Sequence, residues 1–326
     1  MKWFATELIK PCIEKTKSIL FPIKFKLWLK LALLIILAGA IRGGSSPNLR
    51  IPSGVDFSTI TNFMQNYLTY LIIGFVFLVI LGFVAVWMSC VFRFCLLESI
   101  YTKTVHVLRY FKKYMKQGWS FFLFTIVIGL ISLIILGALS LPLVIPIIKN
   151  FSNLSWSIIS IPYLVFFITF FILWIIVYGI FTMLMTHYVL ADMYLNKIKS
   201  SYASFKRMFY LLKKELKQSL LYWLMLFLLG IASAIIFFIA AILAAIPFLI
   251  IALILALFFV GLWALANSLL VILIILGVII GVILISAYIF AIVLVTVPIP
   301  VFFVNYQLSV VQELIKKNKF SLNRFK

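Results

Sequence analysis

Long continuous runs of apolar residues dominate this chain, and short basic segments separate them. The runs do not alternate between apolar and polar positions with a period of two, as the strands of a membrane β-barrel do. A continuous apolar run of about 20 residues can cross the hydrocarbon core of a bilayer as a helix. In lipid such a segment must satisfy its own backbone hydrogen bonds, and a helix does so. The pattern therefore predicts an all-α, polytopic membrane helical bundle.

Six transmembrane helices are predicted, and they pair into three hairpins. The crossings are expected at residues 27–41, 68–92, 119–147, 163–190, 219–246 and 269–300. Each hairpin follows a basic amphipathic segment, so one module of a basic segment and two crossings occurs three times. The three modules form a single integral membrane domain, residues 1–326. The approximate boundaries of the repeats are 1–96, 97–192 and 193–326. The first crossing is the shortest, because Lys30 and Arg42 bound it and must snorkel to the interface.

The longest stretch without charge covers residues 218–312, which contain no Asp, Glu, Lys, Arg or His. Four crossings here would bury cytoplasmic turns, which is costly, so two long crossings are expected. An apolar turn at Asn267 and Ser268 would join them, and Pro247 would end or kink the fifth helix. Residues 248–262 would then be re-entrant, interfacial or part of a long helix. Either lipid or a second copy of the chain must cover the excess apolar surface.

The distribution of charge orients the chain. The sequence is 66% hydrophobic and 11% charged, which is far from the balance of a soluble domain. The net charge of +21 would suggest nucleic acid in a soluble protein. Here all Lys and Arg except Arg42, Arg50 and Lys149 fall on one side of the predicted crossings. Under the positive-inside rule, we expect a multi-pass plasma-membrane protein with both termini cytoplasmic and no nucleic-acid partner.

Two basic segments have the pattern of helices that lie in the membrane interface. In residues 195–217, apolar residues such as Tyr202, Phe205 and Phe209 recur at three- and four-residue steps, with basic residues between them. Residues 97–118 repeat this pattern, which a solvated loop has no reason to show. The candidate contacts to anionic inner-leaflet headgroups are Lys103, Arg109, Lys112, Lys113, Lys116, Lys197, Lys199, Lys206, Arg207, Lys213 and Lys214.

A few polar residues inside or beside the predicted crossings are candidates for a pore or for contacts between hairpins. They are Ser89, Arg93, Thr182, Thr186, His187, Asp192 and Asn267. Arg93 and Asp192 are expected either to pair with each other or to reach the interface independently. Ser and Thr in membrane helices commonly bond the backbone or a neighbouring helix, so helix packing is the alternative to a pore.

No catalytic or metal-binding pattern occurs in the sequence. The chain has seven acidic residues and no HExxH, CxxC, paired carboxylates or glycine-rich phosphate loop. Cys12, Cys90 and Cys95 lack metal-ligand spacing and are expected to pack as small hydrophobic residues. We therefore predict no catalytic residue, no cofactor and no metal, and we do not expect an enzyme.

Two stretches resemble a known family. They are SILFPIKFKLWLKLALL, residues 18–34, and YVLADMYLNKIKSSYASFKRMF, residues 188–209. Both resemble segments of an uncharacterised, largely archaeal family of prokaryotic six-helix integral membrane proteins. This family is distantly similar to the membrane domain fused to glycerophosphodiester phosphodiesterases. The family usually has an acid some five residues before the pair Met193 and Tyr194, where this chain has Thr186, His187 and Tyr188. The resemblance implies the triple-hairpin architecture and no activity.

These observations favour a passive transporter or channel that responds to lipid or membrane tension. The alternative is a non-conducting membrane protein that organises lipid or acts as a scaffold, and a lipid-headgroup enzyme is the third hypothesis. The expected partners are membrane lipids with anionic headgroups and, in a homo-oligomer, a second copy of the chain.

Overall fold

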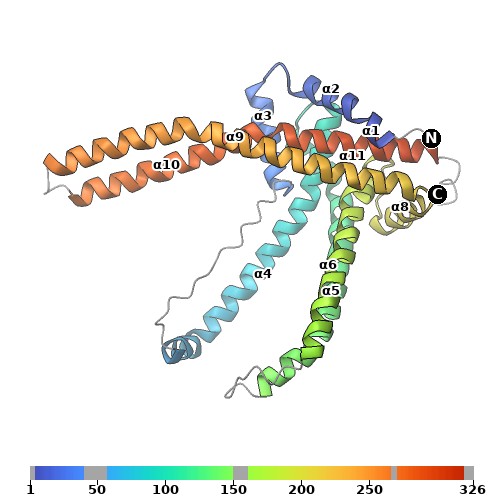
Figure 1. Ribbon diagram of the computed structural model, residues 1–326, viewed down its shortest axis with the longest axis horizontal. Helices are drawn as coiled ribbons and strands as arrows, with labels where there is room; N and C mark the ends of the chain where they lie inside the picture. Colours follow the sequence, from blue (N-terminus) through green and yellow to red (C-terminus); the bar gives the residue numbers. More distant parts are fainter. Residues whose placement is uncertain (1–3, 40–56, 150–160, 266–269, 319–326) are drawn as a thin grey trace. The chain divides into compact units, whose positions relative to one another are not determined.

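The computed structural model describes residues 4–39, 57–149, 161–265 and 270–318. In this part of the chain every regular element is a helix and no strand occurs (Figure 1). The elements are α1 (Phe4–Glu7), α2 (Ile9–Leu20), α3 (Phe25–Leu37), α4 (Phe57–Thr102), α5 (Val107–Lys149), α6 (Ile161–Met183), the π-helix η3 (Leu184–Val189), α7 (Leu190–Leu195), α8 (Ser201–Lys214), α9 (Leu216–Leu265), α10 (Leu270–Thr296) and α11 (Pro298–Lys317). The all-α prediction is confirmed for these residues.

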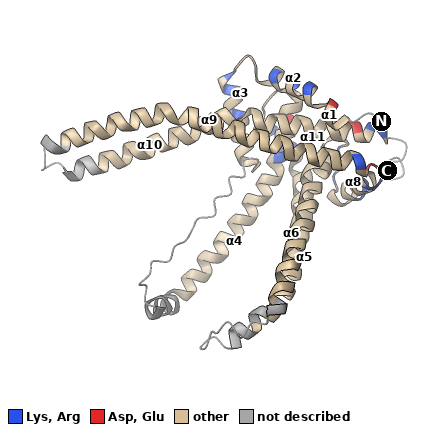
Figure 2. Cartoon of the chain, in the orientation of Figure 1, with Lys and Arg blue, Asp and Glu red and all other residues tan. Residues whose placement is uncertain are grey.

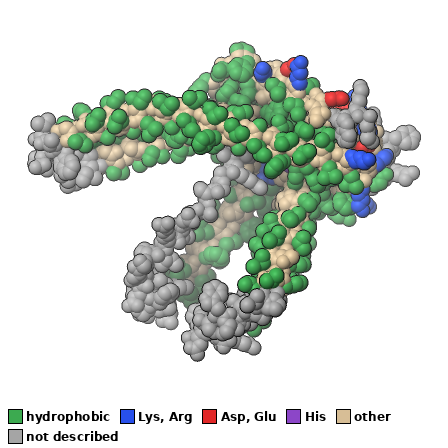
Figure 3. Space-filling model, in the orientation of Figure 1, with side chains coloured by type: hydrophobic (Ala, Val, Ile, Leu, Met, Phe, Trp, Pro, Cys, Tyr) green, Lys and Arg blue, Asp and Glu red, His purple; other side chains and the backbone are tan. Residues whose placement is uncertain are grey.

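Five segments of the described chain are long and apolar enough to cross a membrane. They are Tyr67–Thr102, Val107–Pro142, Leu164–Leu195, Leu216–Leu262 and Ile275–Lys317. They coincide with the second to sixth predicted crossings. Apolar side chains also cover the visible outer surface of the long helices (Figure 3), which a water-soluble protein would bury. The described residues therefore have the all-helical, apolar character of a membrane protein.

The first predicted crossing, at 27–41, differs from the structure. The helix α3 has 13 residues, which corresponds to about 20 Å at 1.5 Å per residue and is short of the roughly 30 Å hydrocarbon core. Gly39 follows it with φ +64°, the left-handed conformation that commonly ends a helix. Residues 40 and 41 lie outside the described residues. Five described helices, rather than six, therefore meet the length requirement.

The fifth predicted crossing, 219–246, forms a longer helix than the sequence predicted. The helix α9 contains 50 residues and continues through Pro247, so residues 248–262 belong to one long helix. Proline removes one backbone donor, but the hydrogen bonds on either side of it keep the helix continuous. Of the two predicted effects of Pro247, an end of the fifth helix is therefore wrong. The helix α10 packs along α9 (Figure 1), and the expected turn at Asn267 lies outside the described residues.

The described chain divides into two compact units. Unit 1 comprises residues 1–36, 96–106 and 212–314, and unit 2 comprises residues 37–95, 107–211 and 315–326. Each has its own buried core. All three cysteines are buried and none forms a disulfide, which agrees with the prediction that they pack.

Polar contacts fasten the N-terminal helices of unit 1 to α11. The Tyr306 hydroxyl donates to the Ala5 carbonyl oxygen at 2.7 Å, and the Asn305 amide donates to the Thr16 hydroxyl at 3.2 Å. The Cys12 thiol lies 3.5 Å from the Ser309 hydroxyl. Burial raises the pKa of the Cys12 thiol, an effect that its hydrogen bond to Ser309 opposes in part. The thiol therefore stays protonated at neutral pH.

In unit 2, α4 crosses α5 at a glycine. A Cβ atom added to Gly118 would lie 2.5 Å from Val91 Cγ2 and 2.9 Å from Val91 Cα. Only glycine allows the two backbones to approach this closely. Next to this crossing, the Phe94 ring stacks on Tyr114 with centroids 5.9 Å apart and meets Phe121 edge-on at 6.1 Å. The close crossing and the aromatic cluster fix α4 against α5.

Replacing Gly118 with valine should therefore destabilise unit 2. The larger side chain must displace the Val91 backbone, which we expect to cost about 1–3 kcal/mol. The measurement is the thermal unfolding midpoint of the purified protein in detergent. Gly82→Val is the matched control, because it changes the same residue type within a helix where an added Cβ atom meets nothing within 4 Å. Equal midpoints for the two variants would contradict the close crossing.

Candidate functional site

A cavity of about 480 Å³ lies within unit 2 between α4, α5 and α6. Its polar lining comes from all three helices and from η3: Ser89, Arg93, Thr125, Tyr178, Thr182 and Thr186. Phe121, Ile128 and Phe181 contribute to its apolar wall. The volume lies within the range of about 300–1,000 Å³ that is common for small-molecule sites. The structure thus brings together four of the residues predicted from sequence, and it adds Thr125 and Tyr178.

A change in helix type shapes one wall of this cavity. The helix α6 ends at Met183 and continues as the π-helix η3 before it returns to α-helix at Leu190. Single π-helical turns inside α-helices are rare and occur frequently at functional sites. Thr182 precedes the π-helix and Thr186 lies within it, and both line the cavity.

Arg93 is the one charged side chain among the described residues that line the cavity. Its Nε donates to the carbonyl oxygen of Ala38 at 3.2 Å, directly before the left-handed Gly39. A guanidinium offers five N–H donors and stays charged at any pH of interest. A charged group within a membrane-crossing segment is costly and marks a functional site by default. The cavity is therefore suited to an anionic group.

The hydroxyl groups of the cavity supply acceptors. Thr125 donates to the Phe121 carbonyl oxygen at 2.8 Å, Thr182 to that of Gly179 at 2.9 Å, and Thr186 to that of Thr182 at 2.8 Å. These bonds match the sequence alternative that membrane hydroxyls bond the backbone. Because each hydroxyl oxygen also has lone pairs, it can still accept a hydrogen bond from a ligand. A ligand with an anionic group and its own hydroxyls would complement both features.

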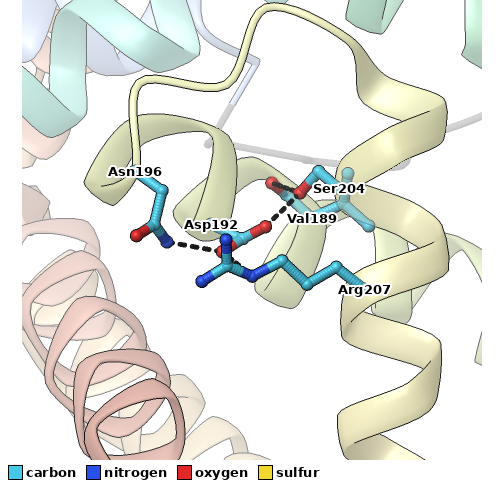
Figure 4. A network of polar contacts seen from close by, with 5 residues as sticks. All are labelled: Val189, Asp192, Asn196, Ser204 and Arg207. Atoms are coloured by element: carbon cyan, nitrogen blue, oxygen red, sulfur yellow. Dashed lines mark hydrogen bonds and ion pairs between the residues drawn. The ribbon is translucent and has the colours of Figure 1, made fainter. Parts of the chain in front are cut away.

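A second polar cluster surrounds the buried carboxylate of Asp192 (Figure 4). The Asn196 amide and the Ser204 hydroxyl each donate to this carboxylate at 2.7 Å, and the Arg207 Nε forms an ion pair with it across 3.5 Å. The Ser204 hydroxyl also lies 3.2 Å from the Val189 carbonyl oxygen. The cluster joins α7 to α8 and lies outside the lining of the Arg93 cavity.

The expected pair between Arg93 and Asp192 is therefore not formed. Asp192 faces α8, which presents Ser204 and Arg207 to it, whereas Arg93 reaches the Ala38 carbonyl. Arg207 was also predicted to contact lipid headgroups. Its side chain is instead only 11% exposed and pairs with the Asp192 carboxylate. The other ten predicted lipid contacts are all exposed. Along α10, by contrast, no Lys or Arg occurs (Figure 2).

Two further predicted site residues, His187 and Asn267, are not among the described residues that line the cavity. His187 lies in η3 but does not line the cavity. Asn267 lies outside the described residues, so the prediction of a pore residue there is untested.

Within unit 2, α8 packs through a face other than the apolar face predicted from the sequence. Ser201, Ser204, Met208 and Leu211 are buried, whereas the predicted apolar face leaves Tyr202 65% and Phe209 46% exposed. The sequence signal for this buried face was the pair of small residues Ser201 and Ser204, because small residues permit close approach between helices. Phe205 on the predicted apolar face still packs against Phe124 and Phe181, with ring centroids 5.6 and 5.5 Å apart, so that face is partly covered.

Removing the charge of Asp192 should destabilise the protein. In Asp192→Asn the Arg207 charge stays buried without its counterion, which we expect to cost about 3–5 kcal/mol. The double variant Asp192→Asn/Arg207→Met should recover part of this loss, because it removes both charges. Thermal unfolding in detergent measures each midpoint, and Lys206→Met serves as the exposed control on the same helix. A double variant less stable than Asp192→Asn alone would contradict this explanation.

Comparisons with known proteins place the chain in a family without assigning an activity. No curated protein and no solved structure matches it. The match of a family model covers residues 3–319, nearly the whole chain. This agrees with the resemblance to an uncharacterised family noted from the sequence. The chain therefore belongs to DUF7544, a family of unknown function.

Proposed function

We propose that this membrane protein binds the headgroup of an anionic lipid in the cavity around Arg93. The observation that supports this best is the composition of the cavity: one guanidinium, several acceptor hydroxyls, and no carboxylate among the described lining residues. A phosphate on a glycerol backbone matches this set, because it offers anionic oxygens to Arg93 and can offer hydroxyls to the threonines.

The neighbouring surface of unit 2 supports the same proposal. Lys112, Lys113 and Lys116 are exposed on the first turns of α5, and exposed lysines of α8 accompany its exposed Tyr202 and Phe209. Aromatic and basic residues together are typical of a helix at the membrane interface. Each such cation contributes about 1 kcal/mol of attraction to an anionic leaflet. These residues would concentrate anionic lipid around the cavity.

The proposal includes a location and a mode of action. The basic segments favour a plasma-membrane protein with both termini in the cytoplasm. We assign it no catalytic role, because Asp192 is enclosed by Asn196, Ser204 and Arg207. It would act as a non-conducting protein that organises lipid, alone or as a homo-oligomer. A distant kinship to the membrane domain of glycerophosphodiester phosphodiesterases would concern architecture and not hydrolysis.

Replacing Arg93 should weaken the binding of anionic lipid. We expect Arg93→Gln to lower the affinity for phosphatidylglycerol by about tenfold or more, because a charge-assisted contact contributes about 1.5–3 kcal/mol. Native mass spectrometry of the protein in uncharged detergent measures the bound fraction during titration with the lipid.

The control for this experiment is Lys24→Gln, which removes one positive charge from an exposed position that is not among the predicted lipid contacts. It should change the affinity by less than about threefold, since exposed charges contribute little. Equal losses in the two variants would show attraction by net charge alone and would contradict a site at Arg93.

A second candidate is passive passage of a small solute through unit 2. One observation favours it: a second hollow, of about 740 Å³, lies between α5 and α6 and shares Tyr178 with the Arg93 cavity. Together the two hollows could form a path along these helices. The hydroxyls of Ser132 and Ser140 would add polar groups to it.

Efflux from proteoliposomes separates the two candidates. Because the lipid-binding proposal requires no aqueous path, we expect vesicles with inserted protein to retain ions and small solutes as well as protein-free vesicles do, also after osmotic downshift. Efflux that exceeds the protein-free rate and falls when Thr182 is replaced by leucine would instead establish a conduit.

A further inference from the structure

We infer that the Arg93 cavity is the headgroup end of a longer site, and that an acyl chain of the bound lipid lies in a groove between α5 and α6. This inference rests on the proposed function, because it takes the headgroup site from it. The groove is the hollow of about 740 Å³ between residues 129–140 of α5 and residues 167–179 of α6.

The groove is continuous with the cavity but has a different chemistry. Tyr178 lines both, and Gly179 of the groove lies three residues from Thr182 of the cavity. Leu133, Leu136, Phe171 and other apolar residues dominate the groove, and the described residues that line it include none with a charge. The Ser140 hydroxyl is bonded to the Gly137 carbonyl oxygen at 2.8 Å. A charged end joined to an apolar channel matches an amphiphile.

The length and direction of the groove match one leaflet. Gly129 and Ser140 bound it on α5, and a helical rise of 1.5 Å per residue gives about 16 Å between them. Half of a hydrocarbon core of about 30 Å is about 15 Å. The groove leads away from the basic first turns of α5, so a lipid with its phosphate at Arg93 would direct its chain toward the membrane centre.

The groove is also accessible from the bilayer and has glycines along it. Leu133 is 67% and Ile175 is 54% exposed, so the lining is open to surrounding lipid rather than sealed as an aqueous path. A Cβ atom added to Gly129, Gly137 or Gly179 would meet nothing within 4 Å. These positions leave room for a chain, and they allow a larger side chain to be introduced without a clash.

The test compares a variant that fills the groove with one that alters the headgroup site. Gly137→Leu places an isobutyl group in the groove, and Gly82→Leu is the matched control on an exposed face of α4. The probes are dioleoyl phosphatidylglycerol, dioleoyl phosphatidylcholine and glycerol 3-phosphate. Native mass spectrometry follows lipid binding, and calorimetry follows glycerol 3-phosphate.

We expect Gly137→Leu to bind phosphatidylglycerol about tenfold more weakly than the parent, because at least two methylene groups of the chain lose their contacts. Its weak binding of glycerol 3-phosphate should stay unchanged, since the Arg93 cavity is intact. Gly82→Leu should resemble the parent with both probes. If Gly137→Leu does not fold, Gly129→Leu fills the same groove and replaces it.

Other outcomes separate the inference from the proposed function. If Gly137→Leu binds phosphatidylglycerol like the parent while Arg93→Gln does not, the chain site is refuted and the headgroup site stands. Equal affinities of the parent for phosphatidylglycerol and phosphatidylcholine would mean that the site does not select an anionic headgroup, which refutes the proposed function and with it the inference that rests on it. Binding of phosphatidylglycerol that is independent of Arg93 refutes the proposed function itself.

Discussion

The structure depends on one constraint, which is that backbone polar groups in lipid must find hydrogen bonds within their own segment. This requirement turns each apolar run into a helix and explains why α9 continues through Pro247. At 1.5 Å per residue, its 50 residues extend about 75 Å, more than twice a hydrocarbon core of about 30 Å. A tilt within the usual range does not absorb such a length, so a single crossing does not account for the whole of α9.

Polar side chains in the membrane-crossing segments are costly for the same reason, so each of them needs a partner or a function. Asp192 and Arg93 both belong to unit 2, but their surroundings differ. Asp192 receives two short hydrogen bonds and an ion pair, so its role is explained by the docking of α8. Arg93 lines a cavity whose described lining has no other charged group. This contrast is why we assign ligand binding to Arg93 and structural support to Asp192.

The docking of α8 links these features. Small side chains on one face allow α8 to approach the bundle, and the Asp192 cluster specifies its position. The consequence is that Tyr202 and Phe209 stay exposed beside lysines, in the arrangement expected at a membrane interface. On the other side of this junction, η3 places Thr186 in the Arg93 cavity. One short region of the chain thus contributes to both the interfacial surface and the candidate binding site.

The sequence by itself determined the helical membrane class, five segments long enough to cross, and four of the six polar residues that line the cavity. These follow from local hydropathy and spacing, which do not depend on distant partners. Only the tertiary structure decided that Asp192 pairs with Arg207, that Ser89, Arg93, Thr182 and Thr186 share one cavity with Thr125 and Tyr178, and which face of α8 docks. The crossing segments are apolar around their whole circumference, so their sequences do not indicate which faces meet. Which helix faces meet is set by packing in three dimensions. At the α4–α5 crossing, a single Cβ atom added to Gly118 would clash with Val91.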